Sequence, residues 1–417
     1  MNTIPTTFNH AMPSYTAVGG NERGASTGLS AVVLTRGGRY PRRALFQELS
    51  KVGFDYIISM DGTQERYDVE ELSGRFPQVR FILLKEQVSL GEQINLGASE
   101  LSSPLFFVFW NDLRILYSGG ASRMAERLFL GQEERGEGQK TLYKRLCTVP
   151  LIQNSHFETL PTVAAPALFR HSVKTLLFTP SREGQDSLYP FDGVGIYDRT
   201  RFIRLGGFDG TLKSTYWQLM DFGFRAYLWG EQIGATQMVR LSYDGETPPE
   251  DSTADESYQR FYLKNLAPVF QGDYAYIPLR RFPAYFWRTG KGLFTALDDF
   301  AEGRRWVYTN RFRFRTDARA VTELWDEGEL AYRRPHAPPP PAAEAPPAAD
   351  AQAAPDTLPA ADAPQAAQDT PDAADTQDAQ AAEAQDTPDE QDAADAQAAA
   401  DEQDAPPAQE KSEPQEA

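Results

Sequence analysis

Cysteine and histidine are scarce in this chain of 417 residues. It has one cysteine, Cys147, and four histidines, of which His156 and His171 lie well inside the chain. A single cysteine cannot form an intrachain disulfide, and no cysteine pair offers the spacing of a zinc site. The sequence therefore excludes a disulfide-stabilised scaffold and a cysteine-ligated metal centre.

Long apolar runs are also missing. No window approaches the roughly 18 apolar residues that a membrane-spanning helix needs. Residues 1–27 contain Pro, Gly, Asn, Ser and Thr without periodicity and lack the apolar stretch of a signal peptide. We therefore expect residues 1–27 to be a mobile leader. We expect the protein to be cytoplasmic, with peripheral contact at the inner face of a membrane as a second option.

The segment 335–417 lacks isoleucine, valine and every aromatic residue. It carries 20 acidic residues and one basic residue, Lys411, so it accounts for the formal net charge of −18 of the whole chain. Its Ala, Pro, Asp and Gln cannot bury enough apolar surface to fold, and the six residues 367–372 recur at 384–389. We predict a disordered acidic tail, whose charge says nothing about what the folded part binds.

Between residues 28 and 115, short apolar runs alternate with helical patterns. The expected strands are 30–35, 56–60, 79–84 and 105–110, and the expected helices are 41–49, 69–76 and 90–101. Alternation of this kind is typical of parallel strands with right-handed crossovers. The sequence predicts an α/β fold with a mainly parallel central sheet and flanking helices. Residues 145–250 have shorter strands and a helix at 216–229, and residues 251–334 are predicted to be a mostly helical extension.

Polar residues follow three of the four predicted strands: Thr35 and Arg36 after the first, Asp61 after the second, and Asn111 and Asp112 after the fourth. Ligands of open α/β sheets bind at the carboxyl ends of the strands. Each residue alone could equally cap a helix or make a turn. Their repetition at equivalent ends indicates a binding site there.

The order of these signals resembles the family-2 glycosyltransferases, which have a GT-A fold. The matching stretches are Ala31–Thr35, Ile57–Gly62, Leu90–Ala98, Phe109–Asp112, Leu205–Asp209 and Asp221–Arg225. The resemblance implies a GT-A glycosyltransferase-like domain at 28–250. Its nucleotide-binding half would be 28–115 and its acceptor half 145–250.

The resemblance also implies roles for individual residues. A strand-end carboxylate such as Asp61 suits the base and ribose of a nucleotide, and Asp112 is the candidate ligand for Mg²⁺ or Mn²⁺ beside a diphosphate. The expected donor-binding residues are Thr35, Arg36, Asp61, Asn95 and Asn111. The expected residues of the acceptor side are Gly207, Asp209, Trp217 and Arg225. For Asn95, capping or packing is the alternative role.

Two motifs depart from the family pattern. The helix that usually opens Glu-Asp-x-Asp reads Gln218 to Asp221 here, which places Leu219 at the usual position of the general base. The Asp-x-Asp motif has also lost an acid, to Trp110 or Leu113 according to register. We therefore expect Asp221 or Asp192 to be catalytic, with Asp209 as a further candidate base. For Asp192, a turn is the alternative role.

Basic and aromatic residues interleave in 280–315, where nine bases and ten aromatics stand against three acids. This composition suits an anionic membrane surface or a lipid-linked diphosphate. A helical cap with solvated arginines, or contact with the acidic tail, explains it as well. Nucleic acid is not the expected partner.

Three functions remain open from the sequence. The first is a glycosyltransferase that moves a sugar from a nucleotide-sugar donor to a glycan, lipid or protein acceptor with inversion. The second is a catalytically inactive GT-A-like binding module. The third is a basic protein of the membrane surface.

Overall fold

The computed structural model describes residues 12–22, 26–36, 41–62, 68–116, 119–129, 145–169, 172–243 and 250–333. All of them belong to one compact unit, Met1–Pro340. The predicted acidic tail, 335–417, lies outside the described residues.

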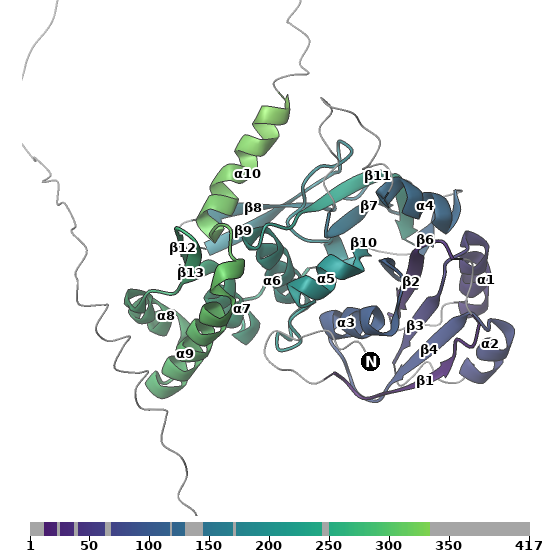
Figure 1. Ribbon diagram of the computed structural model, residues 1–417, viewed down its shortest axis with the longest axis horizontal. Coiled ribbons are helices and arrows are strands. Elements are labelled where there is room, and N and C mark those ends of the chain that lie inside the picture. Colours follow the sequence, from purple (N-terminus) through teal and green to yellow (C-terminus); the bar gives the residue numbers. More distant parts are fainter. Residues whose placement is uncertain are drawn as a thin grey trace, which may run out of the picture. The chain divides into compact units, whose positions relative to one another are not determined.

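A nine-stranded mixed sheet forms the centre of this unit, in the order β1-β4-β3-β2-β5-β10-β7-β11-β6 (Figure 1). Its strands are β1 (Tyr15–Gly19), β2 (Leu29–Leu34), β3 (Ile57–Asp61), β4 (Val79–Leu84), β5 (Leu105–Trp110), β6 (Leu113–Ile115), β7 (Cys147–Gln153), β10 (Gly195–Asp198) and β11 (Ile233–Tyr243). The pairings make β2, β3, β4, β5, β7 and β11 run one way and β1, β6 and β10 the other. The predicted α/β class with a mainly parallel sheet is confirmed.

The strand–helix units of the first half lie close to their predicted positions. β4 and β5 coincide with the predicted strands, and every residue of β2 and β3 is buried. Continuous apolar runs of this kind form strands that are covered on both faces. The helices between them are α1 (Arg42–Val52), α2 (Val69–Arg75) and α3 (Leu90–Glu100).

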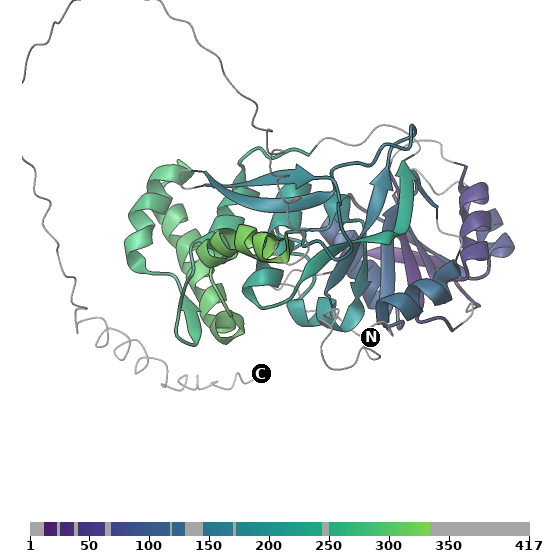
Figure 2. The same ribbon diagram turned by 90° about the horizontal axis from the view of Figure 1, so that it is seen from above.

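Helices cover both faces of the sheet (Figures 1 and 2). Side chains of α1, α2 and α4 (Gly120–Phe129) form one apolar core with one face of β2 and its neighbours. Side chains of α3, α5 (Arg199–Leu205) and α6 (Thr215–Leu228) form a second core on the other face. The hairpin of β8 (Val163–Phe169) and β9 (Ser172–Phe178) adds to the second core.

The leader prediction for 1–27 is wrong at Tyr15–Gly19, which forms β1. This strand pairs antiparallel with β4, and the Tyr15 hydroxyl donates a hydrogen bond of 2.5 Å to Glu100. A short strand can form at a sheet edge without a periodic pattern of its own, because its backbone hydrogen bonds are made with the neighbouring strand. Residues 1–11 and 23–25 lie outside the described residues.

Residues 251–333 are mostly helical, as predicted, with one added hairpin. They form α7 (Glu256–Phe261), the π-helix η3 (Tyr262–Leu266), the hairpin β12 (Val269–Gln271) and β13 (Tyr274–Tyr276), α8 (Phe282–Thr289), α9 (Leu293–Asn310) and α10 (Ala318–Arg333), with single 3₁₀ turns η4 (Leu279–Arg281) and η5 (Arg311–Arg313). Phe261, Phe300 and Trp306 share the core of α3 and α6, so this segment is packed onto the α/β body. None of the helices within the described ranges has the length and hydrophobicity that crossing a membrane requires.

Candidate functional site

The carboxyl ends of β2 and β5 meet at the point where the strand order of the sheet reverses. β2 pairs with β3 on one side and with β5 on the other, so Leu34 aligns with both Met60 and Trp110. The Arg36 backbone N–H donates to Asn111 Oδ1 at 3.0 Å, which ties the two strand ends together. Such a reversal leaves a crevice between the two diverging connections. The predicted meeting of residues 35–36 with residues 111–112 is thus found, with Thr35 half-buried beside Arg36.

One guanidinium group links two carboxylates at this point. Arg36 Nη1 donates to Asp112 Oδ2 at 3.0 Å, and Arg36 Nη2 donates to Asp192 Oδ2. The Arg36 guanidinium also lies 4.2 Å from the ring centroid of Trp110, a favourable cation–π distance. The Trp110 ring therefore supports the cation of Arg36 here. Burial lowers the pKa of Arg36, but Asp192, Tyr243 and Asp112 outweigh it and raise that pKa.

Asp192 is held in place by three separate groups. Besides Arg36, the Tyr243 hydroxyl donates to Asp192 Oδ2 at 2.9 Å and the Trp110 indole donates to the Asp192 carbonyl at 3.0 Å. Its backbone φ is 55°, in the left-handed region that few residues other than glycine adopt. Backbone strain of this kind persists where the surroundings fix it, often at functional sites. Burial raises the pKa of Asp192, although Arg36 and Tyr243 act against that rise.

We call Arg36, Trp110, Asn111, Asp112, Asp192 and Tyr243 the switch-point cluster. A divalent cation would find one protein ligand in it, Asp112 Oδ1, which is buried and has no hydrogen-bond partner among the described residues. No group of three His, Cys, Asp or Glu residues suited to a metal occurs in the described part of the chain. One carboxylate oxygen is nevertheless the donor set of a Mg²⁺ or Mn²⁺ ion that takes its other ligands from phosphates and water. The cluster therefore fits a metal that arrives with a diphosphate.

Asp61 ends β3 as predicted, but its carboxylate is fully buried. It accepts hydrogen bonds from Arg42 at 2.6 Å and from Ser59 at 2.8 Å, and Arg42 also pairs with Asp68 at 2.6 Å. The Arg42–Asp61 pair fastens α1 to the end of β3. The structure brings Asp61 to the predicted edge of the sheet, with its carboxylate turned into this ion pair.

The glycine-rich turn and the helix that carried much of the resemblance are internal. Asn95 exchanges two hydrogen bonds of 2.8 Å with the backbone of Phe208, so it holds the turn, as in its alternative role. Arg225 is fully buried and donates to the carbonyl of Gly207 at 2.8 Å. Trp217 is buried as well, and its indole donates to the Thr253 carbonyl at 2.8 Å. Asn95 and Arg225 therefore position the turn, in which Gly207 accepts through its backbone carbonyl, whereas Trp217 holds the segment at Thr253.

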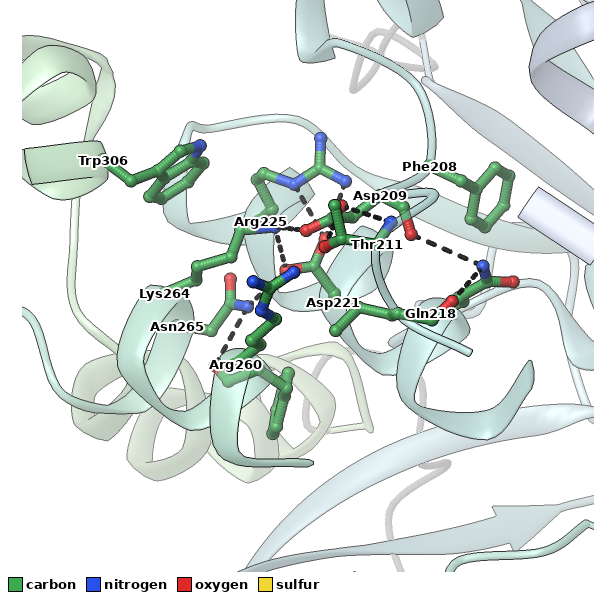
Figure 3. A network of polar contacts seen from close by, with 12 residues as sticks. Phe208, Asp209, Thr211, Gln218, Asp221, Arg225, Arg260, Lys264, Asn265 and Trp306 are labelled. Carbon is green, nitrogen blue, oxygen red and sulfur yellow. Dashed lines mark hydrogen bonds and ion pairs between the residues drawn. The ribbon is translucent and has the colours of Figure 1, made fainter. Parts of the chain in front are cut away.

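A buried charge network surrounds Asp221 (Figure 3). Its carboxylate contacts Lys264 Nζ at 2.7 Å, Arg225 at 2.8 Å and the Asn265 amide at 2.8 Å, while Lys264 also reaches Asp209 at 2.8 Å. Asp209, Asp221, Arg225 and Lys264 have no exposed side-chain surface. We call these four residues with Asn265 the buried charge network. The sequence had suggested that Asp221 and Asp209 would be available as catalytic bases. Both carboxylates are instead buried and paired within this network, so they do not face the switch-point cluster.

A cavity of about 470 Å³ adjoins the switch-point cluster at Asp192. It is lined by Phe191, Asp192, Lys213, Ser214, Thr215, Tyr216, Leu219, Glu250, Asp251 and Asp255. The sequence analysis did not identify Glu250 and Tyr243 as site residues, because neither belongs to a recognisable motif. Lys264 did offer a signal, because a lysine stands between apolar residues in the stretch from Phe261 to Leu266.

No protein-family model matches the sequence, and no curated protein sequence matches it. Solved structures similar to this chain include glycosyltransferases. GalNAc-T7 with UDP, GalNAc and Mn²⁺ has a TM-score of 0.45 and 13% identity, over 73% of this chain and 58% of that one. This chain thus spans little more than half the length of that protein.

Two further similar structures are TarS 1–349 of S. aureus with UDP-GlcNAc and the mannosyltransferase PcManGT of Pyrobaculum calidifontis with GDP-Man and Mn²⁺. The first has a TM-score of 0.39 and 12% identity over 67% of this chain and 72% of that one. The second has a TM-score of 0.35 and 11% identity over 76% of this chain and 83% of that one.

Proposed function

We propose that this chain is a glycosyltransferase that binds a nucleotide-sugar donor at the switch-point cluster and transfers the sugar with inversion to an acceptor hydroxyl. The observation that carries the proposal is the shared contact of Arg36 with Asp112 and Asp192 at the reversal of the strand order. Open α/β sheets bind nucleotides at this point. The adjoining cavity of about 470 Å³ offers room for a sugar beside it.

The charges of the cluster bear on how a diphosphate would be held. Asp112 and Asp192 together carry more negative charge than Arg36 neutralises, so the cluster alone would repel a diphosphate. A divalent cation on Asp112 Oδ1 would supply the missing positive charge and stabilise the leaving diphosphate. Arg36 would orient the phosphates, and Asp192 would keep Arg36 in position. Nucleotide binding should therefore depend on the metal.

We expect titration calorimetry to detect binding of UDP or GDP in the presence of Mn²⁺ and its loss with EDTA. Asp112→Asn should weaken that binding at least about tenfold, or about 1.4 kcal/mol, because it removes the charge of the proposed metal ligand. Glu48→Gln, an exposed change on α1, is the control. Strong nucleotide binding without metal, or unchanged binding in Asp112→Asn, would contradict the metal site. The absence of binding by any nucleoside diphosphate would favour the inactive binding module.

We also propose that the exposed face of α8 and α9 contacts an anionic membrane surface. Trp287 and Phe294 are each 82% exposed, and Tyr308 and Phe312 are exposed as well. In the same segment, the arginines at positions 280, 288, 304 and 305 are exposed too. Aromatic rings that enter the lipid interface, flanked by bases, are complementary to anionic headgroups.

Flotation with phosphatidylcholine vesicles, with and without phosphatidylglycerol, tests this surface. The protein should bind only the anionic vesicles, and Trp287→Ala with Phe294→Ala should weaken binding at least about tenfold, since each buried aromatic contributes about 1.5–3 kcal/mol. Phe178→Ala, an exposed aromatic on β9, should change nothing. Equal binding of the double variant would rule out this face. Binding to a single-stranded oligonucleotide in place of the vesicles would point to nucleic acid.

A further inference from the structure

The cavity beside Asp192 has one wall from α6, and that wall contains no base. Leu219 lines the cavity at the position where the family resemblance expects a proton acceptor, and leucine cannot take a proton. Asp221, two residues further on, is fully buried and paired with Lys264 and Arg225. A glycosyltransferase that acts here must therefore find its base on another element.

Glu250 supplies a carboxylate to the same cavity from the segment that precedes α7. The Tyr189 hydroxyl donates to both of its oxygens, at 3.2 Å and 3.0 Å. This contact fixes the carboxylate while the Glu250 side chain remains part of the cavity wall. Glu250 carries no ion pair with a described basic residue, whereas Asp192 is engaged by Arg36 and Tyr243. The other two carboxylates of the cavity accept backbone N–H bonds, Asp251 from Thr253 and Asp255 from Tyr258. Glu250 is therefore the carboxylate of this cavity that we assign to accept a proton.

The surroundings of Glu250 also strengthen it as a base. Burial raises the pKa of Glu250, the charge of Asp192 adds to the rise, and the hydrogen bond from Tyr189 opposes it. A general base works best when its pKa lies near the working pH, so a carboxylate with a raised pKa is better suited than one with an ordinary pKa. The titratable groups that share its cavity are Asp192, Lys213, Tyr216, Asp251 and Asp255, and Tyr189 contacts it directly.

We propose that Glu250 is the general base of the transfer and that the cavity takes the acceptor hydroxyl. This inference rests on the proposed function. The acceptor oxygen forms a bond to the anomeric carbon of the donor sugar while its proton passes to the Glu250 carboxylate. The bond from that carbon to the diphosphate oxygen breaks, and its electron pair leaves with the nucleoside diphosphate. Glu250 thus replaces the base that α6 lacks.

Release of nucleoside diphosphate from UDP-GlcNAc and GDP-mannose, with water as the acceptor, tests the proposal. Glu250→Gln should lower the rate about 100-fold, in the range of lost general base catalysis, and leave the Kd for UDP or GDP within about twofold. The acid limb of the pH–rate profile should disappear in this variant. Glu48→Gln is the matched control and should retain the wild-type rate and profile.

Tyr189→Phe provides a second and milder variant. It removes the hydrogen bond that lowers the pKa of Glu250, so the acid limb should move to higher pH while the fold is kept. An unmoved limb, or a Glu250→Gln enzyme as fast as wild type, would overturn the assignment of Glu250 and leave the proposed function standing. A wild-type protein that neither binds nucleotide nor releases it would instead overturn the proposed function itself.

Discussion

Lys264→Met is expected to lower the free energy of unfolding by about 3–5 kcal/mol, because it leaves buried carboxylates without their shared cation. Lys264 lies between Asp209 and Asp221 with no exposed surface, and its ammonium group is 4.8 Å from the ring centroid of Trp306. Methionine keeps most of the volume, so the loss reports on charge more than on packing. Urea denaturation followed by tryptophan fluorescence measures it.

Lys291→Met is the matched control for this experiment. Lys291 pairs with Asp299 at the same 2.7 Å, but both side chains are over one-fifth exposed. Exposed ion pairs contribute about 0–1 kcal/mol, so this change should be small. Adding Asp209→Asn to Lys264→Met should recover part of the loss, since Asp221 keeps its pair with Arg225 and Asp209 is the carboxylate left without a cation. Equal effects of Lys264→Met and Lys291→Met would show that the buried charge network does not stabilise the fold.

The same network predicts a sign for the pH dependence of stability. Burial acts to raise the pKa of Asp209, but Lys264 and Thr211 outweigh it and lower that pKa from 3.8 to about 2. A carboxylate whose pKa is lowered by folding stabilises the fold at pH values above its ordinary pKa. This contribution is lost as the pH falls from 3.8 through about 2. In Lys264→Met the Asp209 carboxylate is buried without a cation, so its pKa should rise. Acidification from about pH 7 to about pH 5 should then stabilise the variant.

The strand ends at β2 and β5 could be predicted from the sequence because their information is local. Runs of four apolar residues in β2, Ala31 to Leu34, and of six in β5, Leu105 to Trp110, specify strands covered on both faces, and the polar residue that follows marks the end of each. Parallel pairing then brings Arg36 and Asp112 to one edge without further knowledge. Local signals of this kind predicted the positions of the strands but not their order in the sheet, which depends on pairing between distant segments.

Other parts of the site depend on contacts between distant segments and could not be predicted. Asp192 meets Arg36 across 156 positions of sequence. Asp221 looked available on α6 because the sequence does not reveal that Lys264, from a π-helix far along the chain, covers it. The glycine-rich turn was recognised from its sequence pattern. In the structure its backbone carbonyls accept hydrogen bonds from Asn95 and Arg225, which hold the turn in place. A pattern that resembles a family motif can therefore indicate the fold without revealing which of its carboxylates are buried and paired.

Arg36→Met is expected to abolish measurable nucleotide binding, a loss of at least about 100-fold. The change leaves Asp112 and Asp192 facing one another without a cation, and removing one partner of a buried charged contact costs about 2–5 kcal/mol. Arg36→Lys should not restore binding. The two carboxylates are reached by different nitrogens of one planar group, Nη1 and Nη2, and a lysine has one ammonium for both.

Arg43→Met is the control, because it breaks the exposed ion pair between Arg43 of α1 and Glu71 of α2 and should bind nucleotide normally. Calorimetry with UDP and GDP in Mn²⁺ gives the affinities, and circular dichroism shows whether each variant is folded. Wild-type affinity in Arg36→Met would mean that neither the charge nor the shape of the guanidinium matters for nucleotide binding. Restored binding in Arg36→Lys would mean that charge alone matters at this position. The proposed role requires both the charge and the planar two-nitrogen contact that spans the reversal of the sheet.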